Sequence, residues 1–536
     1  MGRAMRSKLA RVGAALMGGA ALGAAAAAHA APPSDTDAYV AQAMQAFGAP
    51  GLSLAVVEEG RVALARGYGV RRLGTNEAVD AHTSFPIGSE SKAFTAAALA
   101  ILVDRGKLSW DDHVVDRLPG FAMYDPYATA HMTVRDLLTH RSGLGLGEGD
   151  LLVIPGTRRS RADIVHALRY LPPKTGFRES FAYDNILYIV AGALVESVSG
   201  ESWEDFVGRN IFQPAGMADA HANYSPDQPD TVALHARTGQ AIRGEGGESV
   251  LPAPEGFFHG VGPAGGISVS ATDLARWMQV QLAHGVLPNG GRLYSEEQAA
   301  ELWKPVVVVP ADAFKLPAPL AAMQPALQTY ALGWFVESYR GHTVVEHSGA
   351  VFGSLAMLYL IPDKGVGIEV TINSEDSSTR RAVLFHLLDH YLGLPPTDWI
   401  GRLKLARAQS LQSAHAVLDA APAPPASAGV KPALPLDRYA GRYADPWYGP
   451  MTVSAGPSGA LSIDFDETPG MTGALEPLGG DRFRTRWRDA NIENAYVDFT
   501  TGAVTGCTMK AISPLADFSF DYQDLHFVRA GDSQHR

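Results

Sequence analysis

Two hairpin patterns that lie far apart in the chain constrain the fold more than any other feature. In the first, β-rich apolar runs at Gly51–Val57 and Arg61–Tyr68 flank a short turn. In the second, Ser354–Ile361 and Val366–Ile372 flank a Pro-Asp-Lys-Gly turn. We expect one sheet that begins in the first hairpin and resumes in the second, with the segment between them inserted.

The inserted segment shows helical spacing of its apolar residues, for example in Lys92–Asp104, Ile186–Ser199 and Ala271–His284. A further helical pattern at Arg380–Leu392 would complete the domain. Strand patterns at both ends of a mainly helical insertion predict an α+β fold, in which helices flank an antiparallel sheet.

The C-terminal part differs in composition. A polar helical stretch at Asp398–Leu418 leads into Ala420–Pro435, which is rich in Ala and Pro as linkers are. Short strand patterns then recur at regular spacing and predict a small antiparallel barrel or sandwich. They are Tyr439–Tyr443, Met451–Ser454, Leu461–Phe465, Arg482–Trp487, Ala495–Phe499 and Phe518–Phe527.

Residues 1–30 have the pattern of a secretory signal, with a basic head, an Ala/Gly/Leu run and the small-x-small site Ala28-His29-Ala30. We expect cleavage near Ala30 and a periplasmic or secreted protein without a membrane span. Losing this segment removes four basic residues and moves the formal charge from −12 to about −16. Because no basic block follows, nucleic acid is not expected as a partner, whereas a small molecule or peptide is.

Cofactor chemistry finds little support in the sequence. Cys507 is the only cysteine, which excludes an intramolecular disulfide, and its strand-like surroundings favour a small buried residue over a nucleophile. The sequence contains no His-Glu-x-x-His motif and no Walker loop. We expect neither a metal nor a cofactor, and the sequence leaves the oligomeric state open.

A candidate nucleophile comes from Ser89-Glu90-Ser91-Lys92. A turn-like segment precedes it and an Ala-rich run follows, so Ser89 should open a helix with Lys92 on the same face. Burial would disfavour the lysine ammonium and leave free amine to accept the serine proton. Chance alone produces such a motif in a long chain, and we expect Glu90 and Ser91 to form a solvated helix turn.

Two further motifs follow in order, Tyr183-Asp184-Asn185 and His347-Ser348-Gly349. Together with Ser89-x-x-Lys92 they resemble the serine β-lactamase and penicillin-binding protein superfamily, on its class C-like branch. The similarity covers roughly residues 38–395 and includes other landmarks of the family. These are Leu137–Leu144, Gly265–Ser268 and Leu332–Trp334.

The resemblance implies a β-lactamase/transpeptidase-like α+β domain over residues 31–395, with an all-helical region inserted beside its sheet. Residues 396–436 would form the helical and then Ala/Pro-rich linker. Residues 437–536 resemble the lipocalin-like β-barrel often appended to this family, mainly through Tyr439-x-Gly441-x-Tyr443 and Trp487. We hypothesise that this barrel narrows the cleft or presents extended substrates.

Carried over by position, the family roles make Ser89 the nucleophile and Lys92 and Tyr183 the general base and acid, in an order that the sequence leaves open. Asn185 would hold the substrate and the lysine. The backbone N–H groups of Ser89 and Ala350 would form the oxyanion hole.

The third motif departs from the best-known pattern of the family. His347 to Gly349 should form an edge strand beside the nucleophile, where Gly349 lets a substrate approach closely. Many relatives carry Lys-Thr-Gly here, and the lysine recognises a substrate carboxylate, whereas imidazole is neutral over much of the range near pH 7. We expect a structural hydrogen-bonding role for His140 and a packing role for Trp334 near the pocket or in the core.

The sequence thus predicts an exported, metal-independent serine hydrolase of amide or ester bonds, with peptides, including those with D-amino acids, as leading substrates. A β-lactamase or D,D-carboxypeptidase and a short-chain carboxylesterase are the alternatives. A non-catalytic penicillin-binding receptor is a further alternative, which the intact Ser89, Lys92 and Tyr183 disfavour.

Overall fold

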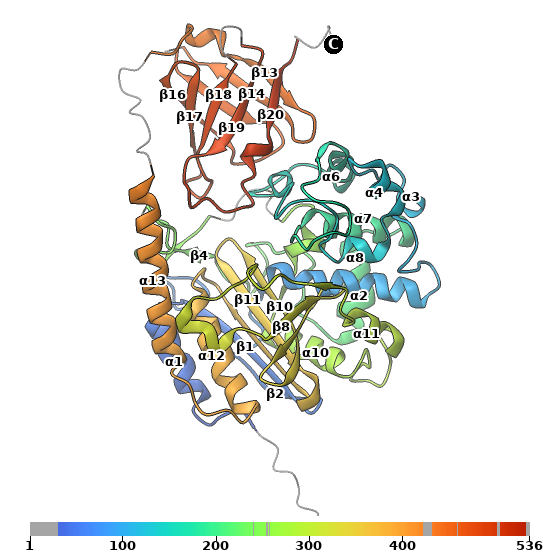
Figure 1. The fold of residues 1–536 in the computed structure, drawn as a ribbon. Helices are drawn as coiled ribbons and strands as arrows, with labels where there is room; N and C mark the ends of the chain where they lie inside the picture. The colour runs from blue at the N-terminus through green and yellow to red at the C-terminus, as the bar shows by residue number, and fades with distance from the viewer. Residues whose placement is uncertain are drawn as a thin grey trace, which may run out of the picture. The chain divides into compact units, whose positions relative to one another are not determined.

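An eight-stranded antiparallel sheet forms the main body of the protein (Figure 1). The computed structural model describes residues 31–239, 241–252, 256, 258–421, 431–457, 459–500 and 504–531, so the predicted signal segment lies outside the described residues. The strand order is β2-β1-β12-β11-β10-β9-β8-β7. The strands are β1 Gly51–Glu58, β2 Arg61–Gly69, β7 Val307–Val308, β8 Leu327–Tyr330, β9 Phe335–Tyr339, β10 His342–Val351, β11 Ser354–Ile361 and β12 Val366–Ile372.

The two predicted hairpins are confirmed, and β1 and β12 join them side by side from Leu52↔Ile372 to Glu58↔Val366. This pairing closes one sheet around the long insertion, as the sequence predicted. The very short or irregular strands β7 to β9 were not predicted, because they carry too few alternating residues to give a period.

Alternating side chains of the sheet pack into two separate cores. Leu52, Leu54 and Val56 face a cluster with α1 (Thr36–Phe47) and α12 (Ser377–Tyr391). Ala55 and Val57 of the same strand face the larger cluster, which is filled by the helical insertion. Burial on both faces explains why β1, β11 and β12 are apolar almost without interruption.

The insertion supplies the helices beside the second face of the sheet (Figure 1). The predicted helices are found with ends shifted by at most a few residues, as α2, α7 and α10. The helices of the insertion are α2 Ser91–Asp104, α3 Val114–Arg117, α4 Pro126–His131, α5 Val134–Leu137, α6 Arg161–Ala167, α7 Ile186–Ser199, α8 Trp203–Val207, α9 Gln213–Ala215, α10 Ala271–Leu282 and α11 Glu296–Leu302.

The C-terminal strands form a closed eight-stranded barrel, which follows the long helix α13 (Trp399–Ala420). Its alternating burial, as in Leu461–Phe465, points every second side chain into the barrel core. Cys507 is buried there, as predicted, and burial raises the pKa of its thiol. The strands are β13 Gly441–Asp445, β14 Gly449–Ala455, β15 Leu461–Phe465, β16 Thr472–Gly479, β17 Arg482–Trp487, β18 Ala495–Phe499, β19 Gly506–Ala511 and β20 His526–Arg529.

One predicted barrel strand is wrong in its extent. The pattern at Phe518–Phe527 predicted a single strand, but β20 begins only at His526 and a 3-10 turn occupies Tyr522–Asp524. Asp517 accepts a hydrogen bond from the backbone N–H of Ser519 at 3.0 Å, which folds the chain locally instead of extending it. The resulting loop carries Phe518, Ser519 and Asp521.

Candidate active site

The site is created by a very close approach of two backbone segments. A Cβ on Gly88, which has φ +53°, would lie 2.5 Å from the backbone nitrogen of Ala350. A Cβ on Gly349 would lie 1.7 Å from the carbonyl oxygen of Ile87 and 3.0 Å from the backbone nitrogen of Ser89. Only glycine fits at either position, and this contact brings together the Ser89 and Ala350 N–H groups that were predicted as the oxyanion hole.

Ser89 itself lies in a 3-10 turn, Gly88–Glu90, that leads directly into α2 at Ser91. The prediction that the serine opens a helix therefore holds to within two residues. Ser89 is half-buried, whereas Lys92, one turn further on, is fully buried. The spacing of three residues brings the Lys92 Nζ to 3.0 Å from the Ser89 Oγ, as predicted.

Two other groups fix the lysine. Its Nζ donates to the Asn185 Oδ1 at 2.7 Å and to the carbonyl oxygen of Ala264 at 2.9 Å. Both are acceptors only, so they take the two N–H groups of a neutral amine and leave its lone pair for the Ser89 hydroxyl. Burial lowers the pKa of Lys92 to about 7, so free amine is present near neutral pH.

Tyr183 completes the group of predicted catalytic side chains. Its ring centroid lies 4.9 Å from the Lys92 Nζ, and its phenol hydrogen-bonds with the Ser89 side chain. Burial raises the pKa of this phenol, which therefore keeps its proton near neutral pH. Asp184 helps to fix the position of the motif, because its Oδ1 accepts from the N–H of Leu187, in the first turn of α7, at 3.1 Å.

A site residue that the sequence did not reveal is Asp150, in the short 3-10 helix Asp150–Leu152. Its fully buried carboxylate accepts from the Asn185 Nδ2 at 3.0 and 3.1 Å. Burial raises the pKa of Asp150 to about 7. Asp150 follows a glycine-rich stretch that belongs to no motif, so only proximity in the folded chain identifies it.

The predicted edge strand is an interior strand in the structure, which corrects one expectation. β10 lies between β11 and β9, but its pairing with β9 ends at Glu346↔Phe335. From His347 to Val351 the recorded pairs are with β11 alone. This half of β10 borders the Ser89 turn and supplies Gly349 and the exposed Ala350 to the site.

The His347 imidazole is buried and its two nitrogens face protein groups. Nδ1 lies 2.7 Å from the carbonyl oxygen of Ser348, which can only accept, so Nδ1 carries the proton. Nε2 then accepts from the Tyr330 hydroxyl at 3.1 Å. Burial and the nearby Lys92 lower the pKa of His347 to about 3, so the ring is uncharged near neutral pH.

Two neighbours of the motif are not solvated, in contrast to the sequence expectation. Glu90 and Ser91 are buried, because the turn is covered by β10 on one side and by residues 262–266 on the other. The Ser91 Oγ accepts from the N–H of Ile267 at 3.1 Å, so this hydroxyl has a structural partner. Burial, together with Glu369, raises the pKa of Glu90 well above its usual range.

The two residues expected to be structural occupy such positions. The His140 Nδ1 accepts from the backbone N–H of Asp184 at 3.2 Å, and its ring packs against Tyr183 with centroids 4.2 Å apart. Trp334 is buried in the larger core. His140 thus supports the segment that carries Tyr183 and Asn185.

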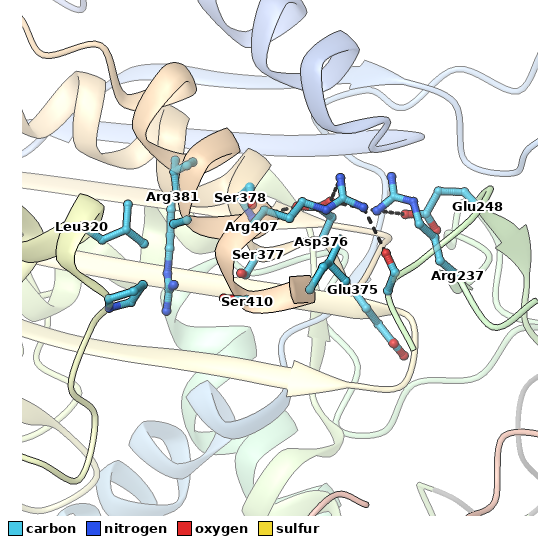
Figure 2. A pocket seen from close by; sticks show the side chains of 15 residues that line it. Arg237, Glu248, Leu320, Glu375, Asp376, Ser377, Ser378, Arg381, Arg407 and Ser410 are labelled. Carbon is cyan, nitrogen blue, oxygen red and sulfur yellow. Dashed lines mark hydrogen bonds and ion pairs between the residues drawn. The ribbon is translucent and has the colours of Figure 1, made fainter. Parts of the chain in front are cut away.

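Figure 2 shows a cavity of about 240 Å³ that contains none of the predicted site residues. Its charged side chains are largely paired with one another, as in Arg237 with Glu248 at 3.3 Å and with Asp376 at 2.8 Å. Within the described part of the chain, no group of three or more His, Cys, Asp or Glu side chains is arranged to hold a metal ion, and no helix is long and apolar enough to cross a membrane.

Comparison with known proteins supports the fold. The family profile described as Beta-lactamase matches residues 36–393, and a profile described as a domain of unknown function (DUF3471) matches residues 425–529. The unguisins hydrolase ungD of Aspergillus violaceofuscus is 27% identical over 84% of this chain and 82% of its own length.

Two solved structures are similar in fold. The octameric penicillin-binding protein homologue from Pyrococcus abyssi has a TM-score of 0.55 and 21% identity, and the match covers 89% of this chain and 98% of that chain. A class C beta lactamase from Rhodobacter sphaeroides has a TM-score of 0.52 and 20% identity over 67% of this chain and 100% of that chain. Both likenesses show a shared architecture.

Proposed function

Because the chain belongs to the beta-lactamase family, we propose that it is a serine hydrolase that cleaves amide or ester bonds through an acyl-enzyme on Ser89. The observation that carries this proposal is the Lys92 amine, which lies 3.0 Å from the Ser89 Oγ while both of its N–H groups are engaged elsewhere. A neutral lysine amine held in this way can act as a base, because its lone pair is directed at the serine hydroxyl.

In the proposed mechanism Lys92 accepts the Ser89 proton as the Oγ attacks the substrate carbonyl carbon. The N–H groups of Ser89 and Ala350 stabilise the oxyanion of the tetrahedral intermediate. Tyr183, which is protonated near neutral pH, passes its proton to the leaving amine or alkoxide and is reprotonated from Lys92. Water then attacks the acyl-enzyme by the reverse sequence of proton transfers and releases the acid.

We propose peptides and related amides as the leading substrates, ahead of β-lactams and D,D-carboxypeptidase substrates. His347 is buried and uncharged, so it does not supply the fixed cation that would recognise a substrate carboxylate. A relative over most of the chain is named a hydrolase, which agrees with turnover rather than with a non-catalytic receptor. Short-chain esters remain the second candidate, because the same acyl-enzyme serves both.

We further propose that the protein is exported, since residues 1–30 combine a basic head, an apolar run and a small-x-small site. The intact mass of the protein recovered from the periplasm or the medium would then correspond to a chain that begins at or near Ala31. Recovery of the unprocessed chain from the cytoplasm alone would contradict export.

Replacing Ser89 with Ala should abolish acylation, because it removes the hydroxyl that lies 3.0 Å from the Lys92 Nζ. The measurement is intact-protein mass spectrometry after a pulse of p-nitrophenyl ester, followed by peptide mapping of the added acyl group. Ser91→Ala is the matched control, since its buried hydroxyl serves the N–H of Ile267, and it should still be acylated. Acylation of the Ser89→Ala variant, together with no acylation of the Ser91→Ala variant, would overturn the assignment.

A substrate panel separates the proposed classes. It comprises p-nitrophenyl esters, D- and L-aminoacyl anilides, muropeptides and nitrocefin, each tested on wild type and on Ser89→Ala. Turnover of anilides or peptides that disappears in the variant is expected. Fast turnover of nitrocefin alone would instead identify a β-lactamase, and stable acylation without turnover would identify a receptor.

A further inference from the structure

The loop that precedes β20 extends from the barrel into the hydrolase site. The Ser519 Oγ donates to the Asp150 Oδ2 at 2.9 Å. The Asp521 carboxylate accepts from the backbone N–H groups of Gly149 at 2.8 Å and Leu151 at 3.3 Å. All three side chains that make these contacts, those of Asp150, Ser519 and Asp521, are buried.

Asp150 determines which way the Asn185 amide faces. The ionised Asp150 carboxylate only accepts hydrogen bonds, so the two bonds at 3.0 and 3.1 Å then require the Asn185 NH2 group on that side. The amide oxygen must then face the Lys92 Nζ, at 2.7 Å. If the amide were reversed, its NH2 group would meet the lysine N–H, and the lysine lone pair would no longer be directed at Ser89.

The barrel loop also packs on Gly147, whose backbone in turn bonds to Tyr183. The backbone N–H of Gly147 donates to the carbonyl oxygen of Tyr183 at 2.9 Å. Phe518 packs on Gly147 so closely that a Cβ there would lie 2.4 Å from the ring. Residues 147–151 are therefore held between the barrel loop on one side and the catalytic tyrosine and asparagine on the other.

We propose that the C-terminal barrel completes the active site, with Ser519 as a positioning residue that acts through Asp150 and Asn185 on the orientation of the Lys92 amine. The proposal rests on the proposed function, in which Lys92 is the base. It assigns a catalytic contribution to a domain whose matching family description states no function.

The electrostatics of the cluster give the proposal a signature in the pH profile. The Ser519 hydroxyl favours the ionised form of Asp150, and ionised Asp150 raises the pKa of Lys92. Removing the hydroxyl should therefore raise the pKa of Asp150, so that Asp150 stays neutral up to a higher pH. The pKa of Lys92 should then fall. The charged and titratable groups that face these two are Tyr183, Asp184, Tyr188, His140, His347 and Asp521.

The test uses the full chain and compares Ser519→Ala with Ser519→Thr. For an ester hydrolysed by wild type, Ser519→Ala should lower kcat about tenfold with KM changed less than about twofold, since the lost hydrogen bond to Asp150 weakens the hold on the Asn185 amide. The acid limb of its kcat/KM profile should move to lower pH. Ser519→Thr retains a hydroxyl and should recover most of kcat and the wild-type limb.

Ser513→Ala is the matched control in the same loop, because the Ser513 Oγ accepts from the N–H of Leu515 at 3.1 Å, a local bond within the loop. It should leave kcat, KM and the pH profile unchanged. If Ser519→Ala keeps the wild-type kcat and pH profile, the proposal is wrong, whether or not its melting temperature falls. Absence of Ser89 acylation in wild type would instead refute the proposed function, so the two failures are distinguishable.

Discussion

At the scale of single residues, the chemistry of the site is set by what each neighbour can donate or accept. Lys92 is useful because Asn185 and the carbonyl of Ala264 occupy its two N–H groups. Its burial keeps part of it uncharged, while the burial of Tyr183 keeps the phenol protonated. Burial thus shifts the two pKa values in opposite directions, which favours Lys92 as the proposed base and Tyr183 as the proposed proton donor. The sequence left this choice open.

Lys92→Arg should lower kcat by about a hundred- to ten-thousand-fold, because the guanidinium stays protonated and cannot accept the serine proton. In wild type, the free-amine fraction falls as pH decreases through the Lys92 pKa of about 7, so kcat/KM should decrease about tenfold per pH unit below that value. Lys107→Arg, on the surface, is the control. An acid limb near the ordinary lysine value would contradict the assignment of Lys92.

At the scale of elements, the site is formed where the connection between β3 (Phe85–Pro86) and α2 crosses β10. The 3-10 turn Gly88–Glu90 lies against Gly349 with no room for a side chain, and the end of the β9 pairing leaves this half of β10 beside the site. The same crossing buries acidic side chains of the turn and sheet. Glu369 of β12 has one carboxylate oxygen bonded to Thr371 at 2.8 Å, whereas its Oε2 is buried without a hydrogen-bond partner.

Burial raises the pKa of Glu369 in the folded protein, so its contribution to stability is lost as pH rises through that raised value. Glu369→Gln removes the charge and keeps the bond from Thr371. At pH 9 we expect the variant to be about 1–3 kcal/mol more stable than wild type, with a much smaller difference at pH 5. Urea unfolding at the two pH values measures this, with exposed Glu77→Gln as the control; equal shifts at both would contradict it.

At the scale of the whole molecule, the barrel and the hydrolase part share buried structure. The larger apolar cluster contains side chains of both. Arg159, from the loop before α6, is buried against the barrel, where it bonds to the carbonyl of Tyr448 and lies 4.5 Å from that ring. It also reaches the Thr468 hydroxyl at 3.4 Å. The contact of Ser519 with Asp150 is therefore part of a broader, buried interface.

Arg159→Ala should destabilise the protein by about 2–4 kcal/mol, because it leaves polar groups of the barrel without a partner and removes packing from Tyr448. Thermal unfolding followed by tryptophan fluorescence reports on this, since Trp447 and Trp487 are buried in the barrel. The neighbouring Arg158 is exposed and should cost less than about 1 kcal/mol when replaced with Ala. Equal effects of the two variants would contradict the interface role of Arg159.

The sequence by itself determined the features that local spacing encodes. The two hairpins, the main helices, most barrel strands and the Ser89–Lys92 pair follow from periods of two or nearly four residues, which local steric constraints impose. Tyr183, Asn185 and His347 came from the resemblance, because no local spacing relates them to Ser89.

Only the tertiary structure decided what depends on contacts between distant segments. The expected edge strand is an interior strand, Glu90 and Ser91 are buried, and residues 518–525 of the predicted barrel strand form a loop. The tertiary structure also brought Asp150 and Ser519, 369 residues apart, to within 2.9 Å. Burial and partnership are properties of the folded chain, so the pKa of Lys92 and the direction of its lone pair are set by packing that no local pattern in the sequence records.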